Sequence, residues 1–286
     1  MRFAPPVIAF LVLVSFACPS DCAAVERTAY LFRADDRSLV SVPLPAPNSG
    51  LFAPTIIASF DWAPIGSALH PDGRILTMNS VTDELVAVTP ATGEVEVLSV
   101  LSEDIPHSAD LFWGIDGSLM CMFRVPTQTE FHRIDPATGA MTLQGTDGES
   151  FKVVATHEGR YYGWDGMQFW DIDPQTFDVT LIVEIPQSPY FSHIAWGLTS
   201  IAGDLWTGIT YSGVVFSDSY VYTMDPFAGQ SIGWVEFVEL VGDETFTALE
   251  VIEQPSPAEV STLQPTGFLA LILSLVVAGV LVLWRR

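Results

Sequence analysis

The feature that most constrains the fold is a short phrase that recurs along the chain at nearly constant spacing. The clearest copies are TPATG at residues 89–93 and DPATG at residues 135–139, and weaker copies begin at Pro45, Asp173 and Asp225. Their prolines are 45, 46, 38 and 52 residues apart. Proline presets φ and glycine supplies a positive φ, so the phrase predicts a tight turn. A second set of turn glycines runs in step, 42 to 44 residues apart: Gly73, Gly117, Gly159 and Gly203.

Short runs rich in β-branched, aliphatic and aromatic residues flank the copies. ELVAV and EVEVLSV flank the turn at Pro90, and FHRI and AMTL flank the turn at Pro136. Two hairpins per period give four strands in about 45 residues, which resembles the blade pattern of a β-propeller. We therefore expect an all-β, five-bladed β-propeller over residues 25–254. No WD or kelch signature is present, and a two-sheet sandwich is the alternative that the regular period disfavours.

The first repeat lacks an innermost strand, because TAYLFRA at residues 28–34 has the character of a second strand. The missing strand is available at the other end of the domain, in TFTALEVIE at residues 245–253. We therefore expect a strand-swapped closure, in which the two ends of the propeller domain pair. Such a closure leaves no open sheet edge between the first and last blades.

The first 24 residues have the composition of a secretory signal peptide. One Arg precedes an apolar run that is too short to span a bilayer, and small residues follow it. Cleavage near Ala24 leaves Cys121 as the only thiol, whereas cleavage after Ala17 leaves Cys18 at the N-terminus, where a lipid can be attached. A disulfide framework is excluded once Cys121 is alone, and its apolar surroundings predict an inert core thiol.

The other end of the sequence predicts a membrane anchor. Residues 255–267 are rich in proline and predict an extended stalk. Residues 268–286 then hold 17 uncharged residues followed by Arg285 and Arg286. At 1.5 Å per residue the uncharged run is about 25 Å long as a helix, which suits a short transmembrane helix. The two arginines are a membrane stop on the cytoplasmic side.

This tail resembles a bacterial C-terminal sorting signal of the PEP-CTERM kind, closest to its IPTL-CTERM variety. Such signals combine a short motif, a hydrophobic helix and a basic end. The resemblance covers residues 258–286 and implies an exosortase-type processing enzyme as a partner and delivery to the cell surface. Ser261 and Thr266 depart from the family's Pro and Trp. The family's Ile, Thr, Leu and Gly correspond here to Val260, Thr262, Leu263 and Gly267.

The charge balance limits the partners. The chain has 34 Asp and Glu against 11 Lys and Arg, a net charge of −23. Nucleic acid is excluded as a partner, because phosphate binding needs a basic surface. Anionic lipid headgroups are disfavoured for the same reason. A solvated acidic surface and diffuse cation binding both remain consistent with this composition.

Acidic and imidazole side chains in the loops that feed the innermost strands are candidates for a site at the mouth of the propeller channel. Hard carboxylate ligands suit calcium, which is therefore the candidate cofactor, and solvated loop charge is the alternative. No DxDxDG loop and no cofactor-binding glycine loop is present. The candidate metal ligands are Asp61, His107, Asp110, His193 and Glu244. Three of them, Asp61, Asp110 and Glu244, are also the candidate carboxylates of a glycoside hydrolase, which needs two such groups 5 to 10 Å apart.

The function that these features favour is a binding or scaffold module, secreted and held at the membrane or cell surface, with an unidentified extracellular ligand. The alternative is an extracellular carbohydrate-active hydrolase with its carboxylates at the channel mouth. The tryptophans recur about once or twice per repeat, which predicts that they pack between blades.

Overall fold

The computed structural model describes residues 26–44, 51–106, 108–184, 191–201, 203–213, 217–225, 227, 233–240 and 246–254. The expected signal peptide, stalk, sorting motif and membrane helix lie outside these residues, together with Val260, Thr262, Leu263, Gly267, Arg285 and Arg286. Within the described residues, no helix is long and apolar enough to cross a membrane. Residues Glu26–Gln254 belong to one compact unit.

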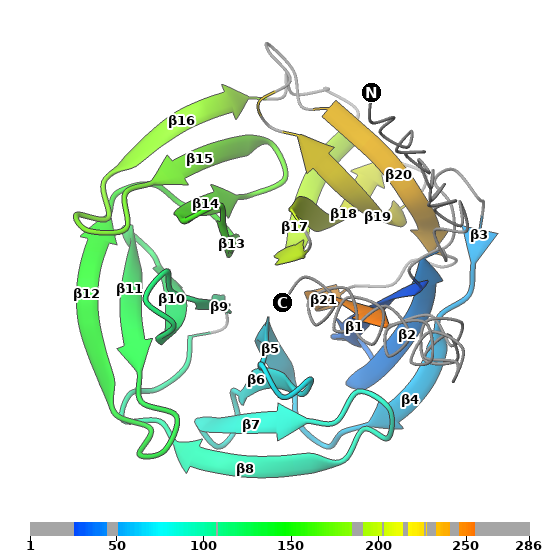
Figure 1. Ribbon diagram of the computed structural model, residues 1–286, viewed down its shortest axis with the longest axis horizontal. Coiled ribbons are helices and arrows are strands. Elements are labelled where there is room, and N and C mark those ends of the chain that lie inside the picture. Colours follow the sequence, from blue (N-terminus) through cyan, green and yellow to red (C-terminus); the bar gives the residue numbers. More distant parts are fainter. Residues whose placement is uncertain are drawn as a thin grey trace, which may run out of the picture. The chain divides into compact units, whose positions relative to one another are not determined.

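The described residues form five sheets that surround a common axis as blades (Figure 1). The first blade has the order β21-β1-β2-β4 and contains β1 (Glu26–Arg33), β2 (Ser38–Leu44), β4 (Thr55–Ser59) and β21 (Phe246–Gln254). The second contains β5 (Pro64–Leu69), β6 (Ile75–Asn79), β7 (Glu84–Val88) and β8 (Val95–Val100). The third contains β9 (Ala109–Trp113), β10 (Leu119–Val125), β11 (Gln128–Ile134) and β12 (Met141–Asp147).

The fourth blade contains β13 (Val153–His157), β14 (Arg160–Trp164), β15 (Gln168–Ile172) and β16 (Val179–Glu184). The fifth contains β17 (Phe191–Ile201), β18 (Asp204–Gly213), β19 (Ser217–Asp225) and β20 (Gly233–Leu240), with β3 (Leu51–Phe52) at its outer edge. The prediction of an all-β, five-bladed propeller is confirmed. The first strand of blades two to five, and β21 in the first blade, is the innermost strand (Figure 1).

The expected strand-swapped closure is also present. Strand β21 pairs antiparallel with β1, from Glu26 opposite Gln254 to Arg33 opposite Phe246. An ion pair of 2.7 Å between Arg27 Nε and the carboxylate of Glu253 joins the same two strands. The two ends of the domain therefore share one sheet.

The repeated phrase forms the turn between the third and fourth strands of a blade. In DPATG the Asp135 carboxylate accepts hydrogen bonds from the Ala137 N–H at 3.0 Å and the Thr138 hydroxyl at 2.8 Å. Gly139 follows with φ 73°, and its amide donates to the Asp135 carbonyl. A Cβ on Gly139 would lie 1.8 Å from the Val100 carbonyl oxygen of the second blade. The glycine is therefore required both by its backbone angle and by contact with the preceding blade.

The same turn takes a different residue in the fourth blade. Phe177 occupies the position of the glycine with φ 62° and is buried. Its ring lies 4.9 Å from the ring of Phe131 and packs on Gly145, both in the third blade. Burial of the ring between blades offsets the cost of a left-handed backbone, which is unusual for an aromatic residue.

One connection differs from the sequence prediction. The first copy of the phrase was expected to form a tight hairpin, as in the other blades. Instead, β2 and β4 pair with each other although ten residues separate them, and part of this connection joins another sheet. Leu51 and Phe52 in β3 pair parallel with Glu239 and Leu240 of β20. The outer edge of the fifth blade is thus extended by a segment from the first.

The core consists of five clusters, and each lies between two neighbouring blades. Trp164 of the fourth blade packs with Leu205 and Ile209 of the fifth, and Trp206 of the fifth packs with residues of the first. These two tryptophans have the predicted inter-blade role. Cys121 is fully buried between the second and third blades, and burial raises the pKa of its thiol. It is therefore an inert core residue, as expected.

Candidate functional site

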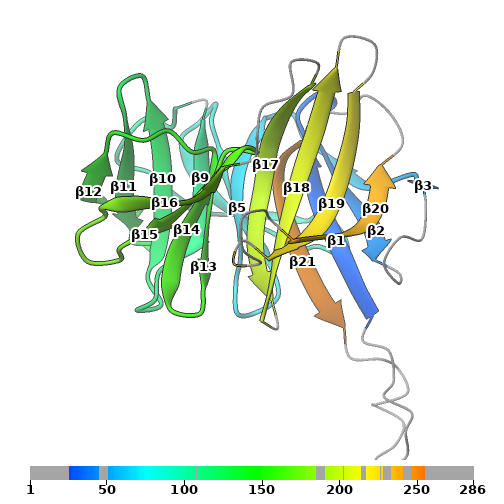
Figure 2. The same cartoon turned by 90° about the horizontal axis from the view of Figure 1, so that it is seen from above.

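The candidate site lies on the axis, where the five innermost strands meet. These strands, β5, β9, β13, β17 and β21, are paired on one side only, each with the second strand of its own blade. Their other edges carry N–H and C=O groups that require partners when they are buried. The strands start at the upper face and end at the lower face, as the arrowheads of β17 and β21 show (Figure 2).

The Asp110 carboxylate accepts hydrogen bonds from backbone amides of three of the five innermost strands. Asp110 is the second residue of β9 and is only 5% exposed. One carboxylate oxygen accepts hydrogen bonds from the amides of Leu111 at 2.9 Å and Ser67 at 3.4 Å, and the other accepts from the amide of Val154 at 2.9 Å. Because Ser67 lies in β5 and Val154 in β13, this carboxylate joins three neighbouring blades.

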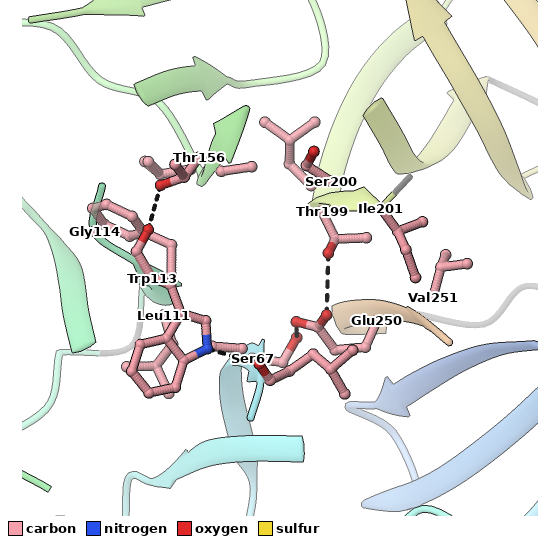
Figure 3. Close-up of a pocket in the computed structure, with 16 residues that line it drawn as sticks. Ser67, Leu111, Trp113, Gly114, Thr156, Thr199, Ser200, Ile201, Glu250 and Val251 are labelled. Atoms are coloured by element: carbon pink, nitrogen blue, oxygen red, sulfur yellow. Dashed lines mark hydrogen bonds between the residues drawn. The ribbon is translucent and has the colours of Figure 1, made fainter. Parts of the chain in front are cut away.

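Glu250 links the first blade, which contains β21, to the second and fifth blades. It lies in β21 and is 3% exposed. One carboxylate oxygen accepts a hydrogen bond from the Ser67 hydroxyl at 2.9 Å, and the other accepts from the Thr199 hydroxyl of β17 at 3.1 Å (Figure 3). The Nδ1 of His157 lies 2.9 Å from the Ser200 hydroxyl, which connects β13 to β17. Side-chain contacts therefore link all five innermost strands in a closed circle.

The surroundings of Asp110 and Glu250 favour the protonated form of both carboxyl groups. Burial raises the pKa of Glu250 from 4.5 to about 7, against the opposing effect of hydrogen bonds from Ser67 and Thr199. Burial also raises the pKa of Asp110 well above its usual range, and the negative charge of Glu250 adds to this effect. The hydrogen bonds from Val154 and Leu111 act in the opposite direction. Desolvation thus outweighs hydrogen bonding at both groups.

A cavity of about 310 Å³ adjoins this circle. It is bordered by residues from the middle and later parts of all five innermost strands (Figure 3). It therefore lies towards the lower face, where these strands end. Glu250 is the only carboxyl group, and there is no Lys, Arg or His, among the described residues that line it. The other polar side chains that line it are Ser67, Trp113, Thr156, Thr199 and Ser200.

The donors of four of these side chains, all but Ser200, already have acceptors within the protein. The hydroxyls of Ser67 and Thr199 donate to Glu250, and the hydroxyl of Thr156 donates to the Trp113 carbonyl. The indole N–H of Trp113 donates to the Leu69 carbonyl at 2.7 Å. A hydroxyl that has donated its proton keeps lone pairs that can accept. The lining side chains therefore offer mainly hydrogen-bond acceptors and one ionisable carboxyl group to a ligand.

The candidate site residues that the sequence predicted do not all lie in the loops at the channel mouth where they were expected. Asp61 is an exposed loop residue, and its carbonyl accepts a hydrogen bond from Arg37. Asp110 and His193 lie inside strands β9 and β17, not in the loops before them as expected. His107, Glu244 and the side chain of His193 lie outside the part of the chain that the structure describes. Among the described residues, no group of three His, Cys, Asp or Glu could hold a metal ion.

Glu250 was not among the sequence candidates. Its strand was expected to be innermost, and Glu250 stands between Leu249 and Val251 in that strand. A charged residue within an innermost strand is buried near the axis and needs partners there. This was the signal in the sequence that pointed to the site.

The five blades and the polar circle on the axis define a five-bladed β-propeller with an axial cavity. No family model matches the chain, and no curated protein matches it. A nidogen/laminin complex aligns over 78% of this chain and 80% of that chain, with 13% identity and a TM-score of 0.46. TolB from Acinetobacter baumannii aligns over 73% of this chain and 52% of that chain, with 15% identity and a TM-score of 0.44. Likenesses at this level of identity concern the fold alone.

Proposed function

We propose that the chain is a binding module that holds a small organic cation, such as a primary ammonium group, in the axial cavity. The observation that carries this proposal is the lining of the cavity, which combines hydrogen-bond acceptors with Glu250 and includes no basic group among its described residues. A positively charged donor is the complement of such a lining. The net charge of −23 also favours the approach of cations.

Binding is better supported than glycoside hydrolysis. Hydrolysis of that kind needs two carboxyl groups that both reach the substrate. Glu250 borders the cavity, but Asp110 does not border it, and its two oxygens accept three backbone hydrogen bonds. Asp61 is exposed in a loop. The described residues thus provide one carboxyl group at the cavity where hydrolysis requires two.

The proposal is tested by calorimetric titration with ethylammonium. Thr156→Phe fills the cavity and should abolish binding, whereas Thr156→Val removes the hydroxyl at nearly constant volume and should retain it. Thr142→Phe, at an exposed position of β12, is the control for adding an aromatic ring elsewhere. Circular dichroism and melting establish that each variant is folded. Equal binding by wild type and a folded Thr156→Phe variant would exclude the cavity as the site.

We further propose that this module is secreted and anchored at the membrane or cell surface. Support comes from the sequence of the leader and from the tail, which resembles a sorting signal read by an exosortase-type enzyme. Deletion of residues 268–286 should release the protein into the periplasm or the medium. If the deleted and full-length proteins fractionate alike, the anchor assignment is wrong and a lipid on Cys18 becomes the better explanation.

A further inference from the structure

Cations are scarce in this chain, and most of those in the described residues are paired with carboxylates. The ion pairs are Arg27–Glu253, Arg33–Asp36, Arg74–Asp72, Arg133–Asp116 and Arg160–Asp171. Arg37 instead donates to the carbonyl of Asp61. Within the described part of the chain, the side chains of Arg124 and Lys152 have neither an ion pair nor a hydrogen bond. In a protein with 34 acidic residues, this is an unusual pair of exceptions.

Both residues lie at the upper face, on neighbouring blades. Arg124 is near the upper end of β10 in the third blade, and its amide donates to the Ser108 carbonyl at 2.9 Å. Lys152, the only lysine of the chain, directly precedes β13 in the fourth blade, and its amide donates to the Trp164 carbonyl at 3.1 Å. Hydrogen bonds of the backbone therefore fix the starting points of both side chains.

The electrostatic environment of Lys152 is unfavourable for its positive charge. Burial lowers the pKa of Lys152, and the charge of Arg124 lowers it further, while Asp165 raises it. Asp165 and Lys152 form no ion pair, and one Asp165 oxygen accepts the amides of Met167 and Gln168, each at 2.7 Å, in its own turn. An anion bound beside Arg124 would offset the positive charge that Arg124 imposes on Lys152.

A groove of about 370 Å³ adjoins Arg124. Its lining includes several side chains with hydrogen-bond donors, and among the described residues the hydroxyls of Ser108, Thr127 and Ser150 form no hydrogen bond within the protein. Unengaged hydroxyls can donate to an oxyanion, and an arginine can bind one through two parallel hydrogen bonds. The groove thus has the opposite chemistry to the axial cavity and lies at the other end of the strands.

We propose that the groove beside Arg124, at the upper face of the third blade, is a binding site for an oxyanion group, a carboxylate, sulfate or phosphate, with Lys152 before β13 as a second cation on the same face. This site is independent of the axial cavity. It gives the acidic propeller a second point of attachment, at which an anionic ligand is held by Arg124 and by the hydroxyls of Ser108, Thr127 and Ser150, while the positive charge of Lys152 adds to the attraction.

The single lysine makes a direct test available. Reductive methylation with ¹³C-formaldehyde labels Lys152 in the full-length chain and preserves its charge. A Lys152→Arg variant identifies its signal and separates it from that of the N-terminal amine. Acetate, sulfate and phosphate are then titrated separately, each against sodium chloride at matched ionic strength. We expect at least one oxyanion to shift the Lys152 signal saturably and to raise the pKa of its amine, and the three titrations identify the preferred group.

The controls distinguish a site from general charge effects. Arg124→Gln should weaken oxyanion binding about tenfold, whereas Arg133→Gln removes an exposed, paired arginine from the same blade and should leave it unchanged. A Lys152 signal that responds to oxyanions only as it does to chloride overturns the proposal. Equal effects of Arg124→Gln and Arg133→Gln also overturn it.

Discussion

At the scale of single residues, Glu250 has the clearest consequence, because it couples the stability of the propeller to pH. Its pKa is raised from 4.5 to about 7 in the folded state. Between these values the unfolded chain binds fewer protons than the folded chain, so the contribution of Glu250 to the free energy of unfolding falls as pH rises. This contribution is complete below about pH 4.5 and is lost as pH rises through about 7. Asp110, whose pKa is also raised, acts in the same direction.

Glu250→Gln removes this titration and keeps most of the shape of the side chain. We expect the slope of the free energy of unfolding against pH, measured by urea denaturation between pH 5 and 7, to become less negative by up to about 1.4 kcal/mol per pH unit. Glu253→Gln is the matched control, because Glu253 lies in the same strand but forms a partly exposed ion pair with Arg27. An unchanged slope in Glu250→Gln would contradict the assignment.

Two glycines with similar backbone angles should respond differently to alanine. Gly117 has φ 76°, and a Cβ there meets nothing within 4 Å, so Gly117→Ala should cost about 1 kcal/mol from the backbone angle alone. Gly139 has φ 73°, but its Cβ would lie 1.8 Å from the Val100 carbonyl oxygen, so Gly139→Ala should cost about 3 kcal/mol or more. Chemical denaturation measures both values. Equal losses would show that the turn does not pack on the preceding blade as described.

At the scale of elements, β21 is the strand on which closure depends. It supplies the innermost strand of the first blade and contributes Leu249 and Val251 to the core between the first and fifth blades. A fragment of residues 25–242 should therefore lose cooperative unfolding, whereas residues 25–256 should retain it. Thermal melts followed by circular dichroism compare the two fragments. Equal melting temperatures would be incompatible with closure through β21.

Local sequence was sufficient to predict most of these elements but not all of their contacts. The turns at Asp135 and Gly73 follow from residues that set φ or bond to their own backbone, so their positions could be read from the repeat. The pairing of β3 with β20 joins residues almost 190 positions apart, and no local pattern specifies it. Asp110 was identified as a candidate, but its role as an acceptor for three strand edges depends on how neighbouring blades approach each other.

At the scale of the whole molecule, the negative charge opposes compactness. The net charge of −23 implies self-repulsion, so added sodium chloride should raise the melting temperature by screening. Calcium is expected to give the same shift as sodium at matched ionic strength, because screening does not require a site. A further concentration-dependent shift that a chelator reverses would instead show that calcium binds, for which the sequence candidates are Asp61, His107, Asp110, His193 and Glu244.

The measurement that most directly tests the central claim, cation binding at the axial carboxyl group, is the pH dependence of ethylammonium binding. Ethylammonium resembles the lysine side chain and stays charged well above pH 8.5. Calorimetry should show wild-type affinity rising about tenfold or more from pH 5.5 to 8.5, as Glu250 ionises around its pKa of about 7. In Glu250→Gln the affinity should be low and independent of pH. Wild-type affinity that is the same at both pH values, or a rise that persists in Glu250→Gln, would contradict the account.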